Sequence, residues 1–225
     1  MEHMIKPIAY IRSCFPDKFG IPRQSGLTPS LKAEIILEKE FRNPDILRGL
    51  SDFSHIWLIW GFSENEDRGW TPTVRPPRLG GNTRMGVFAT RSPFRPNGLG
   101  LSSVRLEEIR SDSSDGPVLV VSGADLMNKT PIYDIKPYIT LDCRKDAVCG
   151  FQDSTKNYRL QVNFPPALLS QIPEELQKGL TEVLAQDPRP SYQNNPDRIY
   201  GISFSDYDVH FRVADGILTV TEIVI

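Results

Sequence analysis

Short runs of β-branched and aromatic residues, separated by turn-forming residues, dominate the first 140 residues of the chain. Examples are residues 7–13 (PIAYIRS), 53–62 (FSHIWLIWGF) and 117–125 (PVLVVSGAD), and no ten-residue helical patterns alternate with them. Because βαβ folds need such helices between their strands, this pattern predicts an antiparallel sandwich or barrel. One short helix is expected at NPDILRGL, where Asn43 suits the cap and Pro44 the first helical position.

The pattern changes after residue 141. A polar connector over residues 142–157 leads to the run YRLQVNF and then to a helical periodicity from about residue 173 to 185, which Pro188 ends. Two glutamates lie in the positive first turn of this helix, and five apolar residues share one face. These five are Ile172, Leu176, Leu180, Val183 and Leu184.

The last residues predict a hairpin that turns at residues 214–216. A helix between β-type segments differs from the all-β pattern of the first part. We therefore expect two domains, a mainly β domain over residues 1–145 and a smaller α+β domain over residues 146–225.

The composition limits the kind of protein. The 225 residues are 39% hydrophobic and 24% charged, as in soluble globular proteins. The longest apolar run is far shorter than the roughly 18 residues that a membrane span requires, and the N-terminus does not resemble a secretory signal. Three cysteines and three histidines lie at spacings typical of neither a disulfide framework nor a zinc site. We expect a cytoplasmic protein without a metal and without a membrane partner.

Positive charge is concentrated between residues 73 and 101. This stretch holds five arginines, five glycines and four prolines but no acidic residue, in a chain whose net charge is -2. Arginine presents a planar fork of donors to carboxylate or phosphate, glycine lets the backbone approach a ligand, and proline stiffens loops. The stretch therefore indicates a preorganised site for phosphate, carboxylate or RNA. The alternatives are solvated loop charges, or a polyproline-type ligand at VRPPRL.

Three other segments carry candidate chemistry. IPRQSG at residues 21–26 is either a binding loop or an ordinary turn. Asp134, Lys136 and Tyr138 are spaced by two and share one face of a strand, either as an acid/base set or as an exposed, salt-bridged face. DPRP at residues 187–190 is either functional or only the end of the helix. Glycine-rich phosphate loops and metalloprotease or hydrolase motifs are absent from the sequence.

Five segments, taken in order, resemble the TrmO (TsaA/YaeB-like) tRNA adenosine N6-methyltransferase family: IPRQSG, LRGLSDFSHIWLIWGF, VRPPRLGGNTRMGVFATRSPFRPNGLGLS, DIKPYI and AQDPRPSY. The likeness covers nearly the whole chain. It implies a mainly β protein whose N-terminal domain is an antiparallel β-barrel of six or seven strands, with S-adenosylmethionine (S-adenosyl-L-methionine) as methyl donor. It also implies a homodimer whose substrate is tRNA and not DNA. The enzyme would methylate N6 of threonylcarbamoyladenosine at position 37, in the anticodon loop of threonine-accepting tRNA.

The resemblance also assigns the residues that bind the methyl donor. They are Pro22, Arg23, Gln24, Ser63, Glu64, Arg91, Leu101, Asp125, Leu126, Met127 and Asn128. Two positions depart from the usual pattern, because a histidine is common in place of Ser63 and DGTP or HGTP is usual where this chain has NKTP. These changes put side-chain contacts by Ser63 and Asn128 in question, whereas backbone contacts would survive them.

Cations are expected to receive the substrate, because the modified adenosine carries a threonine carboxylate on a phosphate backbone. Candidates for these contacts, or for structural anion contacts, are Arg75, Arg78, Arg84, Arg95, Lys136 and Arg189. The donor is an activated sulfonium, so the protein chiefly has to align the reacting atoms. The acceptor nitrogen, which belongs to a urea, must lose a proton, and the candidate acceptors are Asp134, Tyr138 and Asp187.

Two alternatives come from other classes of protein. A noncatalytic module of the same fold would bind RNA or a nucleotide-like metabolite through the same arginines, because a fold does not fix a function. In the second alternative, the basic loops dock an acidic protein.

Overall fold

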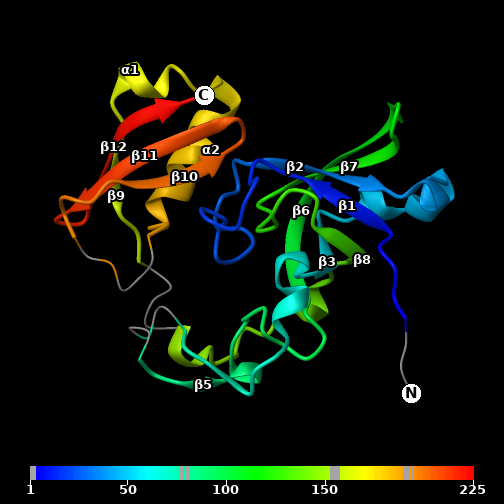
Figure 1. Ribbon diagram of the computed structural model, residues 1–225. Coiled ribbons are helices and arrows are strands. Elements are labelled where there is room, and N and C mark those ends of the chain that lie inside the picture. The colour runs from blue at the N-terminus through cyan, green and yellow to red at the C-terminus, as the bar shows by residue number, and fades with distance from the viewer. Residues whose placement is uncertain (1–3, 77–78, 80–81, 153–157, 190–192, 194) are drawn as a thin grey trace.

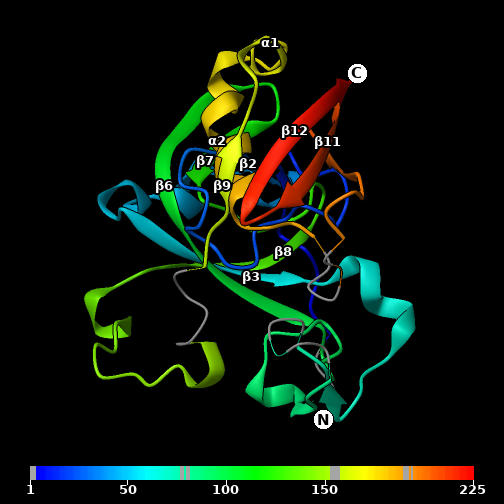
Figure 2. The same ribbon diagram turned by 90° about the vertical axis from the view of Figure 1, so that its left-hand side faces the viewer.

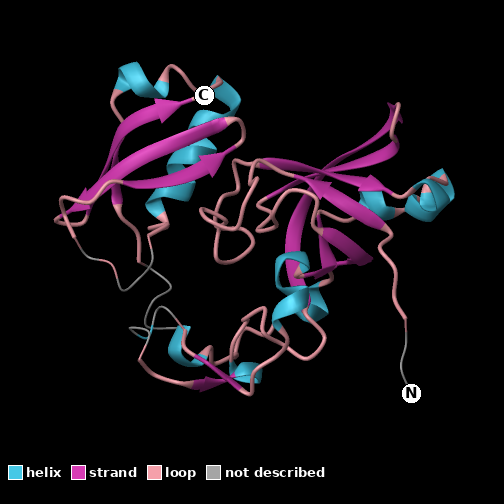
Figure 3. Ribbon diagram, viewed as in Figure 1, coloured by secondary structure: helices cyan, strands magenta, loops and turns pink. Residues whose placement is uncertain are grey.

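Most strands of the protein belong to two groups, one in each half of the chain, and a small third sheet pairs β4 (Thr73–Val74) with β5 (Met85–Gly86) (Figures 1 and 3). The structure is a computed structural model, and it describes residues 4–76, 79, 82–152, 158–189, 193 and 195–225. Within this part of the chain, no helix combines the length and the apolar character needed to cross a membrane.

Six strands of the N-terminal half close into a barrel in the order β1-β2-β7-β6-β3-β8. All neighbouring pairs are antiparallel, including the pair of β1 with β8 that closes the ring. The prediction of a mainly β, antiparallel fold is therefore confirmed. The strands are β1 (Ala9–Arg12), β2 (Lys32–Leu37), β3 (His55–Gly61), β6 (Leu99–Ser113), β7 (Gly116–Ser122) and β8 (Pro131–Pro137).

Alternating side chains fill the barrel. In β1, for example, Ala9 and Ile11 are buried while Tyr10 and Arg12 face outward, as the twofold period of a strand requires. The barrel core also contains fully buried residues of the other strands, among them Ile35, Ile56, Leu58, Leu119 and Ile132. This packing gives the strand ends the fixed positions that a binding site needs.

Short 3₁₀ helices connect β2 to β3. They are η1 (Lys39–Phe41), η2 (Pro44–Leu47) and η3 (Leu50–Asp52). The helix predicted at NPDILRGL is η2, and the side chain of Asn43 caps it by accepting a hydrogen bond from the backbone N–H of Asp45 at 3.0 Å. Gly49 follows with φ of 81°, a conformation that stops the helix after one turn.

The arginine-rich stretch belongs to a long excursion between β3 and β6. Its elements are η4 (Ser63–Arg68), β4 (Thr73–Val74), β5 (Met85–Gly86) and η6 (Val87–Ala89), and β4 pairs with β5. A hydrogen bond from the backbone N–H of Phe62 to the carbonyl of Gly98, at 2.9 Å, closes the base of the excursion. In Figure 1 the excursion, marked by β5, lies below the two groups of strands.

The C-terminal half forms a four-stranded sheet in the order β10-β11-β12-β9, with helix α2 against one face (Figure 2). The predicted helix is α2 (Glu174–Ala185), and the predicted hairpin is the pair β11 and β12, so both predictions are confirmed. The elements after the barrel are η7 (Thr140–Asp142), η8 (Gly150–Gln152), β9 (Gln161–Asn163), α1 (Pro166–Leu169), α2, β10 (Tyr200–Phe204), β11 (Tyr207–Ala214) and β12 (Ile217–Val224).

Residues 13–31, which we call the β1–β2 connection, tie the two halves together. Phe15 and Leu31 of this connection are buried in the core of the C-terminal half. The carbonyl of Cys14 accepts a hydrogen bond from the backbone N–H of Ser205 at 2.7 Å. The hydroxyl of Ser30 donates to the carboxylate of Glu182 at 2.7 Å. The core of the C-terminal half therefore includes residues from the N-terminal side of the predicted domain boundary. This boundary, between residues 145 and 146, stays a prediction.

Replacing Leu31 by alanine tests this link. Leu31 is 3% exposed, and it packs so closely on Gly179 of α2 that a methyl group on Gly179 would lie 2.0 Å from a Leu31 methyl. We expect Leu31→Ala to lower the free energy of unfolding by about 2–5 kcal/mol, measured by urea denaturation. Leu141→Ala, at a side chain that is 73% exposed, is the control and should change it by less than about 0.5 kcal/mol. Equal effects of the two substitutions would contradict the assignment.

Candidate active site

A cavity of about 840 Å³ lies at the end of the barrel where β3 ends and β6 begins. Its walls come from five segments of the chain and from Gln152. The segments are the β1–β2 connection, the end of β3 with η4, residues 88–95, the start of β6, and the turn at residues 125–130. A cavity of this size is typical of a small-molecule or cofactor site.

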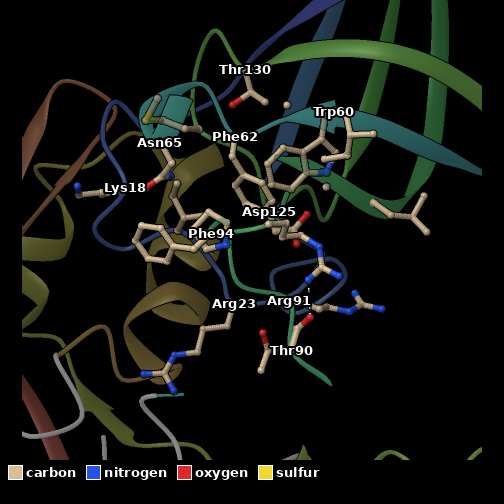
Figure 4. A pocket seen from close by; sticks show the side chains of 18 of the residues that line it. Lys18, Arg23, Trp60, Phe62, Asn65, Thr90, Arg91, Phe94, Asp125 and Thr130 are labelled. Atoms are coloured by element: carbon tan, nitrogen blue, oxygen red, sulfur yellow. Dashed lines mark hydrogen bonds between the residues drawn. The ribbon is translucent and has the colours of Figure 1, made fainter. Parts of the chain in front are cut away.

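Aromatic rings form one wall of the cavity. The rings of Trp60 and Phe62 meet edge to face with centroids 4.4 Å apart, and Phe94 contributes a third ring from the excursion (Figure 4). The indole N–H of Trp60 donates to the hydroxyl of Ser102 at 3.0 Å, which fixes the orientation of the indole. Such a wall suits a flat heterocycle.

Gly100 makes room for the Trp60 ring. It lies opposite Trp60 in the β3–β6 pair, and a methyl group on Gly100 would lie 2.3 Å from the indole. Gly100, the second glycine of NGLGL at residues 97–101, therefore serves packing at the start of β6. The Trp60 indole lies across the bare backbone of this glycine.

Asp125 brings a half-buried carboxylate to the same cavity, next to Trp60 and Phe62 (Figure 4). Burial raises the pKa of Asp125 above its ordinary value of 3.8, although the Ser102 hydroxyl and the charge of Arg91 act in the opposite direction. Its Oδ1 atom is buried and has no hydrogen-bond partner among the described residues. A carboxylate with an unused buried oxygen is suited to a positively charged or hydrogen-bond-donating ligand group.

The end of β1 holds the turn that carries Asp125. The Ser13 hydroxyl donates to the carbonyl of Leu126 at 2.9 Å, and the Ser13 backbone N–H donates to Oδ1 of Asn128 at 3.2 Å. Leu126 is 1% exposed and belongs to the barrel core. Neither Leu126 nor Asn128 lines the cavity, so these two predicted cofactor residues face the scaffold.

The other nine predicted cofactor residues all line the cavity, although they come from all five of these wall segments. They are Pro22, Arg23, Gln24, Ser63, Glu64, Arg91, Leu101, Asp125 and Met127. Their contacts with a methyl donor stay predictions.

Asp187 and Arg189 form a buried ion pair beside the cavity, with side chains 11% and 9% exposed. The Asp187 carboxylate accepts two hydrogen bonds from the Arg189 guanidinium, at 2.8 and 3.0 Å, and one from the Tyr158 hydroxyl at 2.8 Å. Burial opposes ionisation, but these hydrogen bonds prevail and lower the pKa of Asp187. Its backbone carbonyl accepts from Nη2 of Arg23 at 3.2 Å. The pair therefore touches the cavity through Arg23.

Asp134, Lys136 and Tyr138 do not line the cavity. Nζ of Lys136 lies 2.7 Å from Oδ2 of Asp134, and both side chains are substantially exposed. The Tyr138 ring packs against Trp57, with centroids 5.2 Å apart. The structure thus has the exposed, salt-bridged face that the sequence left as one alternative, and the catalytic roles stay predictions.

The arginines of the basic stretch do not form one cluster. Among the described ones, Arg91 and Arg95 line the cavity, whereas Arg75 and Arg84 do not. Arg84 instead donates to the Thr73 hydroxyl at 2.7 Å and braces the pair of β4 and β5. Arg78 lies outside the described residues.

The sequence did not predict several of the lining residues, chiefly the aromatic ones. Trp60 and Phe62 lie two residues apart at the end of a strand, and Phe88 and Phe94 flank Arg91 in FATRSPF. The closeness of Phe88 and Phe94 to Arg91 in sequence was the one available sign that aromatic residues line the site. The sequence does not show, however, which aromatic residues lie outside the hydrophobic core.

The barrel, the cavity at its end and the order of the lining segments define a class of protein. Residues 10–143 match the family model of the tRNA-methyltransferase O N-terminal domain, and residues 157–225 match that of the TrmO C-terminal domain. The chain belongs to the tRNA-methyltransferase O family.

Individual relatives cover nearly the whole chain. A tRNA (adenine(37)-N6)-methyltransferase of Escherichia coli (strain K12) is 41% identical over 218 residues, which are 93% of this chain and 92% of that protein. A protein of Pseudomonas aeruginosa (strain PAO1), whose name classes it among S-adenosylmethionine-dependent methyltransferases, is 42% identical over 94% of this chain and 93% of its own. A crystal structure of TrmO from Pseudomonas aeruginosa superposes with a TM-score of 0.80 at 36% identity, over 100% of this chain and 97% of that one.

Gly100→Ala tests the packing of Trp60. The new methyl group would collide with the indole, so we expect a shift in tryptophan fluorescence and at least about a tenfold loss of affinity for a ligand of the cavity, measured with S-adenosylhomocysteine by calorimetry. Gly86→Ala is the matched control, because a methyl group there meets no atom within 4 Å. Unchanged fluorescence and affinity in Gly100→Ala would show that the glycine is not needed for this packing.

Proposed function

We propose that this protein is an S-adenosylmethionine-dependent tRNA methyltransferase that modifies N6 of adenine 37. Membership of the tRNA-methyltransferase O family over both halves of the chain supports this activity most strongly. A cavity that combines an aromatic wall, an unpaired carboxylate oxygen and bordering arginines agrees with it in chemistry.

We further propose the finer points that the resemblance implies. The substrate is threonylcarbamoyladenosine beside the anticodon of threonine-accepting tRNA, and the enzyme works as a cytoplasmic homodimer. Residues 1–145 bind the methyl donor, and residues 146–225 form the small second domain. A light-scattering mass equal to the monomer would refute the dimer without affecting the other points.

The residues that line the cavity fit the methyl donor. Trp60 and Phe62 offer apolar faces to an adenine, and the unpaired Oδ1 of Asp125 offers a negative charge to the cationic part of the donor. Arg23 and Gln24 of the β1–β2 connection add hydrogen-bond donors to the lining of the cavity. When bound, S-adenosylmethionine supplies a methyl group that is activated by a positively charged sulfur.

The protein's own contribution is chiefly to position the reactants and to exclude water. Arg91 is exposed at the cavity and is suited to bind the carboxylate of the methyl donor, in line with the cofactor contact that the resemblance implies. Arg95 also lines the cavity, but it donates to the carbonyls of Val87 at 3.2 Å and Thr90 at 2.7 Å. We therefore assign Arg95 to holding the loop and Arg91 to capturing the anion.

Of the three proposed proton acceptors, Asp187 is the one connected to the cavity, through the bond from Arg23 to its carbonyl. The lowered pKa of Asp187 keeps its carboxylate ionised, as a proton acceptor requires, but it also makes the carboxylate a weaker base. To accept a proton, Asp187 must give up a side-chain hydrogen bond, because Arg189 and Tyr158 donate to both of its carboxylate oxygens. The proposal requires that the substrate displace the Tyr158 hydroxyl.

The activity is tested with labelled S-adenosylmethionine and tRNA from an Escherichia coli strain that lacks its tRNA (adenine(37)-N6)-methyltransferase. We expect label in the methylated form of threonylcarbamoyladenosine. Arg91→Ala should lose at least about tenfold in transfer while staying folded, because an exposed loop arginine contributes little to the core. Arg48→Ala, at an exposed ion pair outside the cavity, is the control.

Two other results would contradict the proposal. If tRNA binds without any transfer, the protein is a noncatalytic module. If a protein partner stays bound after ribonuclease treatment, the basic loops dock that protein instead.

Asp125→Asn is expected to weaken donor binding and to stabilise the fold. A raised pKa in the folded state means that folding is disfavoured as the pH rises from 3.8 through the folded-state pKa, and that this cost persists at neutral pH. Removing the charge should therefore raise the melting temperature near neutral pH, with a smaller difference at about pH 4, while calorimetry shows weaker binding of S-adenosylmethionine. A variant that is less stable and binds normally would contradict both expectations.

A further inference from the structure

One exposed aromatic side chain stands out at the border of the cavity. Phe88 lines the cavity, yet 78% of its surface is exposed. The side chain of its neighbour Val87 is only 3% exposed, so at this point one side chain is buried and the next is exposed to solvent. Single exposed apolar side chains are common on protein surfaces, so it is the position of this ring, on a loop at the border of a charged cavity, that points to a ligand contact.

The backbone around Phe88 is firmly held. The carbonyl of Val87 accepts hydrogen bonds from the backbone N–H and the hydroxyl of Thr90, at 3.2 and 2.9 Å, and from the guanidinium of Arg95 at 3.2 Å. The Val87 N–H donates to the carbonyl of Pro72 at 3.0 Å. Phe88 is therefore displayed by a preorganised turn, and a ligand that meets the ring does not have to order the loop.

Arg95 also acts on the ring itself. The centre of its guanidinium lies 5.8 Å from the centroid of the Phe88 ring, within the range of a cation–π interaction. Proteins that bind single-stranded RNA combine aromatic rings, on which bases stack, with arginines that attract the backbone. Phe88, Arg91 and Arg95 bring these two components together within eight residues of sequence.

We propose that Phe88 is a stacking platform for an unpaired nucleobase of the substrate RNA, next to the nucleotide that enters the cavity. This inference rests on the proposed tRNA substrate. The ring lies at the border and is mostly exposed, so it meets a group that stays outside the cavity, as a flanking base does. A second copy of the chain is the alternative occupant, because the centres of protein interfaces are enriched in aromatic residues and arginine, and light scattering distinguishes it from RNA.

Kinetics with the tRNA described above test the platform. Phe88→Ala should raise the KM for tRNA roughly 5- to 100-fold, as expected for loss of one stacked base, with unchanged affinity for S-adenosylhomocysteine. Phe88→Trp should keep the KM within about threefold, because it retains an aromatic face. Phe88→Leu should behave like Phe88→Ala, because it retains apolar bulk but no π face. Phe19→Ala, at a ring that is 55% exposed and outside the cavity lining, is the control.

A fluorescent base gives a direct reading of stacking. In an anticodon stem-loop with 2-aminopurine beside position 37, wild-type protein and Phe88→Trp should change the fluorescence on binding, and Phe88→Ala should not. The platform is refuted if Phe88→Leu keeps the wild-type KM, or if Phe88→Ala changes the mass in light scattering instead of the KM. If wild-type protein methylates tRNA normally and Phe88→Ala is unaffected, only this inference fails. If stem-loop binding depends on Phe88 but no methyl is transferred, the proposed activity fails and the platform stands.

Discussion

The docking of the β1–β2 connection against both halves of the chain is the constraint on which the rest of the structure depends. Phe15 and Leu31 complete the C-terminal core, while Lys18 and Arg23, between them, line the cavity. Arg23 in turn donates to the carbonyl of Asp187, two residues after the end of α2. Because one segment performs both tasks, packing in the C-terminal half fixes the position of one wall of the site. Gln152 is the one lining residue among the described residues after Thr130, so the C-terminal half acts on the cavity mainly through the β1–β2 connection.

A second feature of the site is that hydrogen bonds within the excursion hold its arginines in fixed positions. The excursion between β3 and β6 has little regular structure, yet Arg95 and Thr90 fasten it to the carbonyl of Val87, and Arg84 braces β4 against β5. Two arginines are thus used to hold the loop, which leaves Arg91 beside the half-buried Asp125. A methyltransferase needs such alignment more than it needs a nucleophile, because its donor is already activated.

The sequence predicted the fold better than it predicted the reacting groups. Twofold alternation in the strands and the apolar face of α2 follow from periods that burial imposes, so these elements were foreseeable. The segments of the cavity followed from family motifs. The role of Gly100, the buried pair of Asp187 and Arg189, and the outward face of Asp134 depend on which elements meet in space. No local pattern distinguishes an arginine that binds a ligand from one that binds a carbonyl, so the sequence did not show that Arg95 donates to backbone carbonyls.

We propose that the cavity at the end of the barrel holds the methyl donor between the aromatic wall and Asp125. A crystal structure of the protein soaked with S-adenosylhomocysteine tests this placement. We expect electron density for the adenine against Trp60 and Phe62, and a polar contact to the carboxylate of Asp125. Density for the ligand at another place, with these side chains left in contact with solvent, would contradict it.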